Sequence, residues 1–378
     1  KGGGSEIRES LLSSEVDNSR SGWRRFYGLD FFDKKLGSVL NRKLLDEVFP
    51  GRPVIVRFKS GHGFLLNSAA MSELGINEFT PEPSGATFER SIPTGLLTGV
   101  FFDSEQILQR RIPPIPKSNL YDGFRSVNDL LNTEGYTCVV DATVENDIER
   151  LRYLAQIKKA GLISSDVLFM PGWPYLQEFK ENNIQHGDRY QGILISCVKI
   201  VLTFSSGKIM PNFQELLEIV RGAHEIGYPT AIHAVEKECV AQAAEVLKLS
   251  QIPGDRIEHA SEIDDETLQV LSSTTVGIST QPSLINQNGD RYISEVPKER
   301  LEYLYRINSM DKSGLSVGFS SDGPVTFPKG VRTLKAAISR RSSGGIILNP
   351  EERVSLVTSL GMMTSRNSAI SGVGTKKG

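Results

Sequence analysis

Short, continuous apolar runs alternate with stretches of helical periodicity from about residue 119 onward. The runs predict seven β-strands, over residues 137–141, 166–170, 192–202, 229–233, 256–259, 275–281 and 315–321. Six helices are predicted around them, over residues 121–133, 148–160, 213–226, 236–249, 264–271 and 298–312. Strands that are apolar on both faces are typical of parallel strands covered by helices. This part of the chain therefore predicts repeated parallel βα units.

Two architectures share this local pattern, the doubly wound open sheet and the (β/α)8 barrel of the TIM type. An open sheet binds its ligands at one switch point between strands. The residues with candidate chemistry follow four different strands here, which favours an α/β fold of the barrel type. Seven strands leave an eight-stranded barrel one short, and the strand that should come first in the sequence is not visible.

The first 118 residues show no comparable repeat. They have a polar start over residues 1–20, a short predicted strand over residues 54–58, and a stretch rich in Gly, Pro and Thr over residues 75–99. This pattern indicates a small β-rich accessory region. We therefore divide the chain into an accessory region (1–118), barrel strands two to eight with their helices (119–370) and a short tail (371–378). The chain lacks an initiator Met and stops without a closing element, so we expect it to be truncated at both ends.

Residues with metal-ligating side chains stand at the ends of several predicted strands. His233 ends one run, His259 ends the next, Asp322 follows the last, and Lys199 lies in an earlier run. Imidazole and carboxylate are natural ligands of zinc and related ions. We predict a divalent metal site, with zinc expected, held by Lys199, His233, His259 and Asp322. Asp322 would also accept the proton of the nucleophilic water as general base.

Each of these residues also has a structural explanation. A single histidine after an apolar strand is commonly a hydrogen-bonded core residue, and Asp322 before Gly323 could simply form a turn. Lys199 could be ion-paired, because burying an ammonium group is costly unless it is paired or neutralised. Trp173 would line the mouth of the site or serve only in packing. The combination on the fourth, fifth, sixth and eighth strands favours the metal site.

Composition excludes several classes of partner. The chain has 378 residues, 43 basic and 45 acidic, so its net charge of −2 gives no general attraction to nucleic acid or anionic membrane. No apolar run approaches the roughly 18 residues that a membrane span needs. The three cysteines, Cys138, Cys197 and Cys239, are widely spaced and odd in number, which argues against a disulfide scaffold and favours the cytoplasm. A homodimer is the base-rate expectation.

The chain resembles the amidohydrolase superfamily, and within it the amidohydrolase 3 branch that includes N-substituted formamide deformylases. The resemblance extends from about Trp23 to Ala369 and lies in the order and spacing of its motifs rather than in any single one. The motifs are Pro53–Val56 leading to Gly61-His62, Asn67–Ala70, Pro93–Leu97, Gly135–Asp141, Val198-Lys199, Ile232–Ala234, Arg256–His259, Gln281-Pro282, Ser321–Val325 and Thr364–Ala369.

The resemblance implies a site of one or two metal ions and roles for individual residues. His233 and His259 would ligate metal, Asp322 would be ligand and general base, and Lys199 would be a carboxylated lysine bridging two ions. His62 would lie near the substrate mouth, although a surface histidine in a Gly-His-Gly turn is the alternative. Gln281 would be a further substrate-binding residue.

One part of the family pattern is absent. The family carries a His-x-His pair at the end of its first barrel strand, and the sequence contains no such pair. Either the chain is a fragment, or it is a variant with a depleted site. The first reading implies a metal-dependent hydrolase that cleaves a non-peptide C–N bond in a small amide, N-formyl or cyclic amide substrate, using metal-activated water. The second implies a non-catalytic binding or scaffold protein on the same fold.

Overall fold

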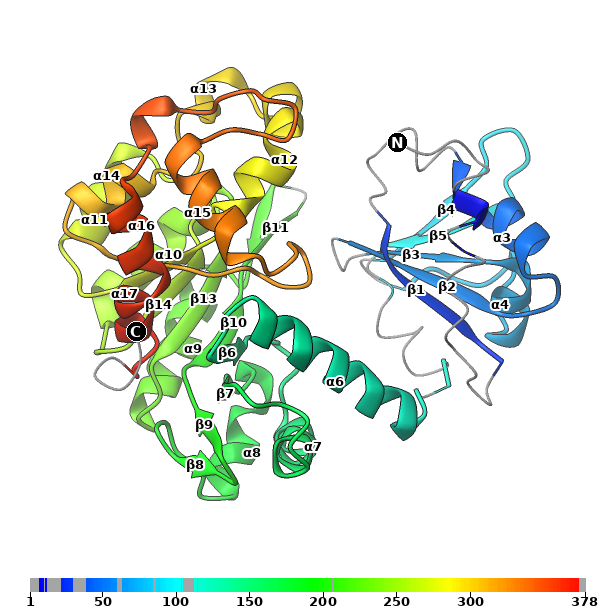
Figure 1. The fold of residues 1–378 in the computed structure, drawn as a ribbon, viewed down its shortest axis with the longest axis horizontal. Helices are drawn as coiled ribbons and strands as arrows, with labels where there is room; N and C mark the ends of the chain where they lie inside the picture. Colours follow the sequence, from blue (N-terminus) through cyan, green and yellow to red (C-terminus); the bar gives the residue numbers. More distant parts are fainter. Residues whose placement is uncertain are drawn as a thin grey trace. The chain divides into compact units, whose positions relative to one another are not determined.

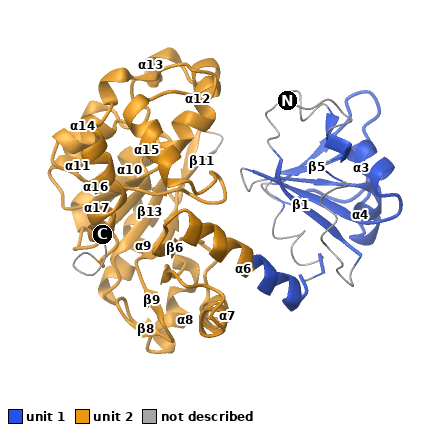
Figure 2. Ribbon diagram, in the orientation of Figure 1, with its two compact units in different colours: residues 1–123 blue, residues 124–378 orange. Residues whose placement is uncertain are grey.

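The computed structural model describes residues 7–9, 11, 22–29, 39–59, 63–83, 86–102, 104, 112–113, 115–205 and 207–373. These residues form two compact units, 1–123 and 124–378 (Figure 2). Each unit has its own strands and its own apolar core. His62, a predicted substrate residue, lies outside the described residues.

Among its described residues, the first unit has a five-stranded sheet and the short helices α3 and α4 (Figure 1). Its elements are β1 (Arg24–Leu29), α3 (Arg42–Val48), β2 (Val54–Phe58), β3 (Gly63–Leu66), α4 (Ser68–Glu73), β4 (Thr87–Arg90) and β5 (Leu97–Phe102). The strand order is β1-β2-β3-β5-β4, parallel between β1 and β2 and antiparallel elsewhere.

Two apolar clusters stabilise this sheet, one on Trp23 and Phe101 and the other on Leu45 and Phe58. Asn67 ties the turn into α4: its Oδ1 accepts from the backbone N–H of Val54 at 2.9 Å and caps the helix at Ala70. The strand predicted over residues 54–58 is β2.

The second unit holds the predicted βα repeats. Its strands are β6 (Cys138–Asp141), β7 (Asp166–Phe169), β8 (Arg189–Tyr190), β9 (Ile193–Ile195), β10 (Val198–Val201), β11 (Thr203–Ser205), β12 (Lys208–Met210), β13 (Thr230–Ala234), β14 (Arg256–His259), β15 (Gly277–Thr280) and β16 (Ser316–Phe319). Its helices are α7 (Ile148–Lys159), η1 (Trp173–Tyr175), α8 (Leu176–Glu181), α9 (Phe213–Glu225), α10 (Lys237–Ser250), α11 (Asp265–Ser272), α12 (Ser283–Glu295), α13 (Lys298–Leu301), α14 (Ile307–Lys312), α15 (Gly330–Ser339), η2 (Pro350–Glu352), α16 (Leu356–Met363) and α17 (Ser365–Ile370), while α6 (Lys117–Thr133) spans the boundary.

Side-chain caps explain where several of these helices begin. Asp147 and Asp264 each accept a backbone N–H of the first turn of α7 and α11. At α9, Asn212 and Glu215 form a reciprocal capping box. These contacts satisfy N–H groups that have no partner within the helix, so the polar residue before each apolar stripe sets the helix start.

In the described part of the second unit, eight parallel strands follow one another in sequence order, because the run predicted over residues 192–202 contains both β9 and β10. One sheet pairs β6, β7 and β9, and a second pairs β10, β13, β14, β15 and β16. A parallel bridge between Gly172 and Lys199 joins the first set to the second. Among the described strands, β6 and β16 stand at the two ends of this series and are not paired with each other. The structure thus shows the parallel α/β repeat, while a closed eight-stranded barrel stays a prediction.

The strands β13 to β16 have two unlike faces. Ile232, Ile257, Ile278 and Val317 form the apolar face, which packs with core residues of α9, α10, α11 and α14 (Figure 1). Because side chains alternate along a strand, the residues between them point the other way. We call this second set the polar face; its members are Lys199, Ala231, His233, Arg256, Glu258, Gly277, Ser279 and Gly318, as the strand register requires.

Two predicted elements differ from the structure, and one hairpin had no counterpart in the prediction. The strand predicted over residues 192–202 is interrupted at Ser196 and Cys197, between β9 and β10. The helix predicted over residues 298–312 is two short helices, because Tyr305 has φ +50° and donates its N–H to the Ser261 carbonyl instead of continuing a helix. The hairpin of β11 and β12 was not predicted, since its strands are only three residues long.

In the described part of the chain, no helix combines the length and the apolarity that a membrane crossing requires. The described residues form no disulfide among the three cysteines, and Cys197 and Cys239 are buried.

Candidate functional site

His233 and His259 meet at the carboxyl ends of two adjacent strands. Their ring centroids lie 4.4 Å apart, with the rings nearly perpendicular. The contact brings the two imidazoles together at one edge of the sheet, and their role as ligands of one ion stays a prediction.

The backbone at the end of β14 explains how His259 reaches this position. In the strand register Glu258 lies beside His233 and His259 lies beside Ala234, so simple alternation would turn the two imidazoles to opposite faces. His259 and Ala260 instead have φ of +74° and +46°, which end the strand. Left-handed backbone at a residue with a side chain costs roughly 1–2 kcal/mol. Such strain commonly accompanies functional positions.

Asp322 follows β16 and shows the same backbone feature, with φ +52°. Burial raises the pKa of its carboxyl group, and the nearby His259 and Lys199 oppose that rise. These interactions place Asp322 within electrostatic range of the two residues. A carboxylate with a raised pKa exchanges protons nearer to neutral pH than an exposed one.

Lys199 lies on β10 beside Ala231 of β13 and is only 5% exposed. Burial lowers the pKa of its ammonium group, and Arg256 lowers it further, whereas the carboxylates of Glu258 and Asp322 act in the opposite direction. The lysine is thus held in a buried setting that favours its neutral amine.

The neutral form is also favoured at His259. Burial lowers the pKa of its imidazole below the ordinary value, although Asp322 acts in the opposite direction. Neutral imidazole is the form that binds metal.

A buried ion pair lies on the polar face one step along β14 from His259. Arg256 Nε donates to Glu258 Oε1 at 2.6 Å, and both side chains are less than a tenth exposed. Burial alone would raise the pKa of Glu258, but the Arg256 guanidinium and Lys199 lower it to about 2. Our sequence reasoning did not assign a role to this pair. The sequence carries a signal for this pair: Arg256 and Glu258 have opposite charges and stand two residues apart in a strand. Residues two apart in a strand share one of its faces.

Trp173 lies in η1, directly after β7, and is 39% exposed. Lys199 donates its N–H to the carbonyl of Pro171 at 2.8 Å, which brings this segment alongside β10. Gly172 is required there, since a Cβ would lie 1.8 Å from the Val144 carbonyl oxygen. Trp173 therefore stands near the strand that carries Lys199, and its contact with substrate stays a prediction.

Gln281 follows β15 and contacts His259 rather than open space. Its Oε1 lies 2.7 Å from His259 Nδ1, and the side chain is 1% exposed. Ser320 and Ser321 were also not predicted. Ser320 accepts from Gln281, and the Ser321 side chain lies near Tyr136, which precedes β6.

The fit to a metal ion is incomplete. In the portion of the chain that the structure describes, no three His, Cys, Asp or Glu side chains are arranged to hold an ion together. The structure brings His233 and His259 into contact, with Asp322 and Lys199 nearby, and the roles of all four as ligands stay predictions.

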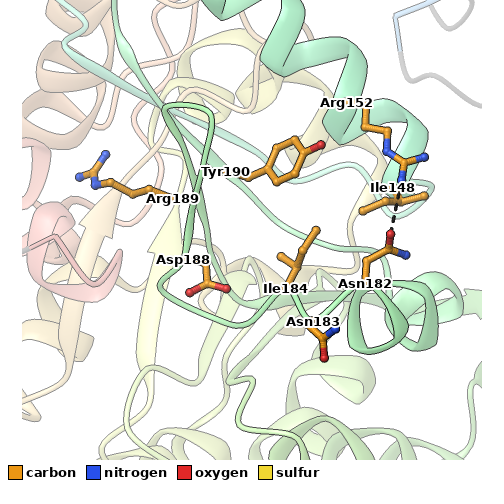
Figure 3. A pocket seen from close by; sticks show the side chains of 8 residues that line it. All are labelled: Ile148, Arg152, Asn182, Asn183, Ile184, Asp188, Arg189 and Tyr190. Carbon is orange, nitrogen blue, oxygen red and sulfur yellow. Dashed lines mark hydrogen bonds between the residues drawn. The ribbon is translucent and has the colours of Figure 1, made fainter.

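A surface pocket of about 320 Å³ lies away from these residues (Figure 3). It is lined by Ile148, Arg152, Asn182, Asn183, Ile184, Asp188, Arg189 and Tyr190. Its polar groups contact one another or their neighbours: Arg152 donates to Asn182 at 3.3 Å and pairs with Glu149. None of the predicted site residues lines it.

Comparison with known proteins decides the family. Residues 19–378 match the model described as the amidohydrolase family. The chain belongs to the amidohydrolase family. This agrees with the resemblance drawn from its motifs.

Individual relatives are distant. The chain is 22% identical over 364 residues to YtcJ of Bacillus subtilis (strain 168), covering 89% of this chain and 68% of that protein. It is 25% identical over 395 residues to an N-substituted formamide deformylase of Arthrobacter pascens, covering 93% of this chain and 71% of that protein. It is 22% identical over 371 residues to the protein LONG AFTER FAR-RED 3 of Arabidopsis thaliana, covering 87% of this chain and 62% of that protein. The chain thus spans between 62% and 71% of the length of these three relatives.

The solved structures support the fold. An uncharacterized metal-dependent hydrolase from Pyrococcus horikoshii OT3 superposes with a TM-score of 0.76 at 22% identity, over 98% of this chain and 76% of that one. A second uncharacterized metal-dependent hydrolase, from Pyrococcus furiosus, superposes with a TM-score of 0.73 at 22% identity, over 98% of this chain and 77% of that one. The chain therefore has the fold of these two solved proteins.

Proposed function

We propose that this chain carries the later-strand part of a metal-dependent hydrolytic site that cleaves a non-peptide C–N bond. The observation that carries the proposal is the contact between the His233 and His259 rings at the carboxyl ends of β13 and β14. Membership of the amidohydrolase family supports hydrolysis. The similarity to an N-substituted formamide deformylase supports small amide or N-formyl substrates.

In this proposal His233, His259 and Asp322 hold a divalent ion, with zinc as the expected metal. When bound, such an ion polarises a carbonyl group and lowers the pKa of water. His259 contributes a neutral imidazole, since burial lowers its pKa. Lys199 is the candidate for carboxylation, because burial lowers its pKa and favours the uncharged amine that reacts with carbon dioxide.

Asp322 would move the proton. Its carboxylate accepts a proton from the attacking water and passes it to the leaving nitrogen, which would otherwise depart as a poor amide anion. The raised pKa of Asp322 supports this exchange, because the proton is then held for long enough to be transferred.

We further propose that the protein works in a reducing compartment, with the cytoplasm as the expected one, because its three cysteines are odd in number and widely spaced along the chain.

The replacement Asp322→Asn tests the chemistry. General acid–base catalysis contributes about 10²–10⁴-fold in rate, so kcat for N-substituted formamides should fall by about that factor while thermal unfolding is unchanged. The assay uses the full natural product of the gene loaded with zinc, and Asp265→Asn is the matched control, since Asp265 is 87% exposed on α11 and pairs with Arg306. An Asp322→Asn protein with wild-type turnover would refute the assignment.

The alternative is a non-catalytic protein that binds a ligand on the same fold. Elemental analysis separates the two functions, because a natural product that retains no divalent ion after loading cannot use the proposed mechanism.

A further inference from the structure

Gln281 is a buried amide whose hydrogen-bonding atoms all have partners in the protein. It follows β15 and is 1% exposed. Its Nε2 donates to the Ser279 carbonyl at 3.1 Å and to Ser320 Oγ at 2.8 Å, while its Oε1 lies 2.7 Å from His259 Nδ1. Both amide hydrogens are therefore used, and no donor of Gln281 is left for a substrate.

These partners determine which way the amide faces. A backbone carbonyl can only accept a hydrogen bond, so the group facing Ser279 must be the NH₂ of Gln281. The oxygen must then face His259. An amide oxygen is an acceptor only, so the nitrogen of His259 that faces it must carry the proton.

The neighbouring strand supports this orientation. Ser320 donates its backbone N–H to the Thr280 carbonyl at 3.0 Å, which places Ser320 directly beside Gln281. The Ser279 hydroxyl donates to Ser320 Oγ at 3.3 Å. Ser320, directly after β16, therefore fixes the orientation of the Gln281 amide through its hydrogen bond to the NH₂ group. The Gln281 oxygen in turn fixes the orientation of the His259 ring.

We propose that Gln281 is a positioning residue that fixes His259 as the Nδ1–H tautomer and leaves Nε2 as its only nitrogen able to bind metal. Metal-binding histidines commonly donate their other ring N–H to a carbonyl or carboxylate, which fixes the ring and its tautomer. Gln281 then acts through His259 and not by contact with substrate. Only the metal part of this inference rests on the proposed function; the tautomer follows from the hydrogen bonds alone.

The tautomer can be read directly by NMR. The protein labelled with ¹⁵N-histidine has five histidines, and long-range ¹H–¹⁵N spectra of the metal-free chain at pH 8 distinguish Nδ1–H from Nε2–H at each neutral ring. The signal of His259 is assigned from its loss in His259→Gln. We expect the wild-type ring in the Nδ1–H form. A wild-type His259 in the Nε2–H form would overturn the proposal, whatever the variants do.

Two variants test the role of Gln281. Gln281→Met keeps the length of the side chain but removes the acceptor, so the Nδ1–H population of His259 should fall. Gln281→Glu keeps an oxygen acceptor and should retain the Nδ1–H form. His224 is the internal control, because its Nε2 lies 3.0 Å from Asp255 Oδ1 and its signals should not change in either variant. An unchanged His259 tautomer in a folded Gln281→Met protein would contradict the proposal.

Zinc affinity gives a second readout. Loss of an outer hydrogen-bond partner typically weakens metal binding by about 10–100-fold, so Gln281→Met should bind zinc that much more weakly, and Gln281→Glu should recover most of the affinity. If the tautomer changes as expected but the wild-type protein binds no zinc, the positioning role stands and the proposed function fails. Equal zinc affinity in the wild type and Gln281→Met would refute the positioning role while leaving the metal site in place.

Discussion

The two faces of the β13–β16 strands differ in the kinds of residue they carry and in the contacts those residues make. The apolar face repeats isoleucine and valine against helices, and each residue there contributes through burial. The polar face carries the histidine pair, the Arg256–Glu258 ion pair and two glycines at which α17 residues come close. One face holds the sheet to its helices, while the other accepts buried charge and strained backbone. That difference favours the polar face as the location of the proposed site more clearly than any single residue does.

The largest stability effect is expected from breaking the ion pair on the polar face. Arg256→Met leaves the Glu258 carboxylate buried without its guanidinium, and removing one partner of a buried pair typically costs about 3–5 kcal/mol. Urea unfolding measures this loss. The double variant Arg256→Met with Glu258→Met should recover most of it, because apolar residues can replace a buried pair. A single variant as stable as the wild type would contradict the account.

The pH dependence of stability gives a second view of the same pair. The pKa of Glu258 is lowered to about 2 in the folded protein, so the folded state binds this proton less readily than the unfolded chain. The stabilisation is fully present above the ordinary carboxyl pKa, and it is lost as the pH falls toward 2. This pH dependence should be weaker in Arg256→Met.

The apolar face should respond in a different way. Ile257→Ala removes a fully buried side chain and should destabilise by about 2–5 kcal/mol, by loss of burial and creation of a cavity. Zinc bound per folded molecule should be unchanged, as measured by elemental analysis of the purified folded protein. Val357→Ala, at an 80% exposed position of α16, is the control and should stay within about 0.5 kcal/mol of wild type. A loss of bound zinc in folded Ile257→Ala would contradict the separate roles given to the two faces.

A smaller effect is expected where the polar face meets α17. A Cβ at Gly318 would lie 2.7 Å from Ile370 Cδ1 and 3.0 Å from Asn367 Cα, so Gly318→Ala should cost about 1–3 kcal/mol through overpacking. Gly222→Ala, in α9 with no atom within 4 Å of its Cβ position, should instead stabilise by about 0.5–1 kcal/mol. Thermal unfolding of the two variants compares them directly. Shifts of the same sign would contradict the packing described for Gly318.

Much of the fold of the second unit could be predicted because buried parallel strands are continuous apolar runs. The strand predicted over residues 256–259 is β14, and the helix predicted over residues 213–226 closely matches α9. The interruption at Ser196 and Cys197 was missed, since both residues are buried and the run stays apolar through them. The break at Tyr305 depends on a hydrogen bond to Ser261, which lies 44 positions earlier in the chain.

The candidate site was predictable only in part. The order of His233, His259 and Asp322 along the chain located the strand ends, because those ends share one edge of a parallel sheet. The sequence could not show the positive φ that turns His259 toward His233, nor the hydrogen bond from His259 to Gln281. Both depend on how the chain leaves β14, and L-residues in this backbone region have no reliable local signal. His62 was predicted from a motif and lies outside the described residues.

The central claim is that His233 and His259 together bind a divalent ion. Equilibrium dialysis of the full natural gene product against zinc, followed by elemental analysis, tests it most directly. We predict that the wild type and His224→Ala retain at least one zinc ion per chain, and that His233→Ala and His259→Ala each retain far less while remaining folded. Equal zinc content in all four proteins, or none in the wild type, would contradict it.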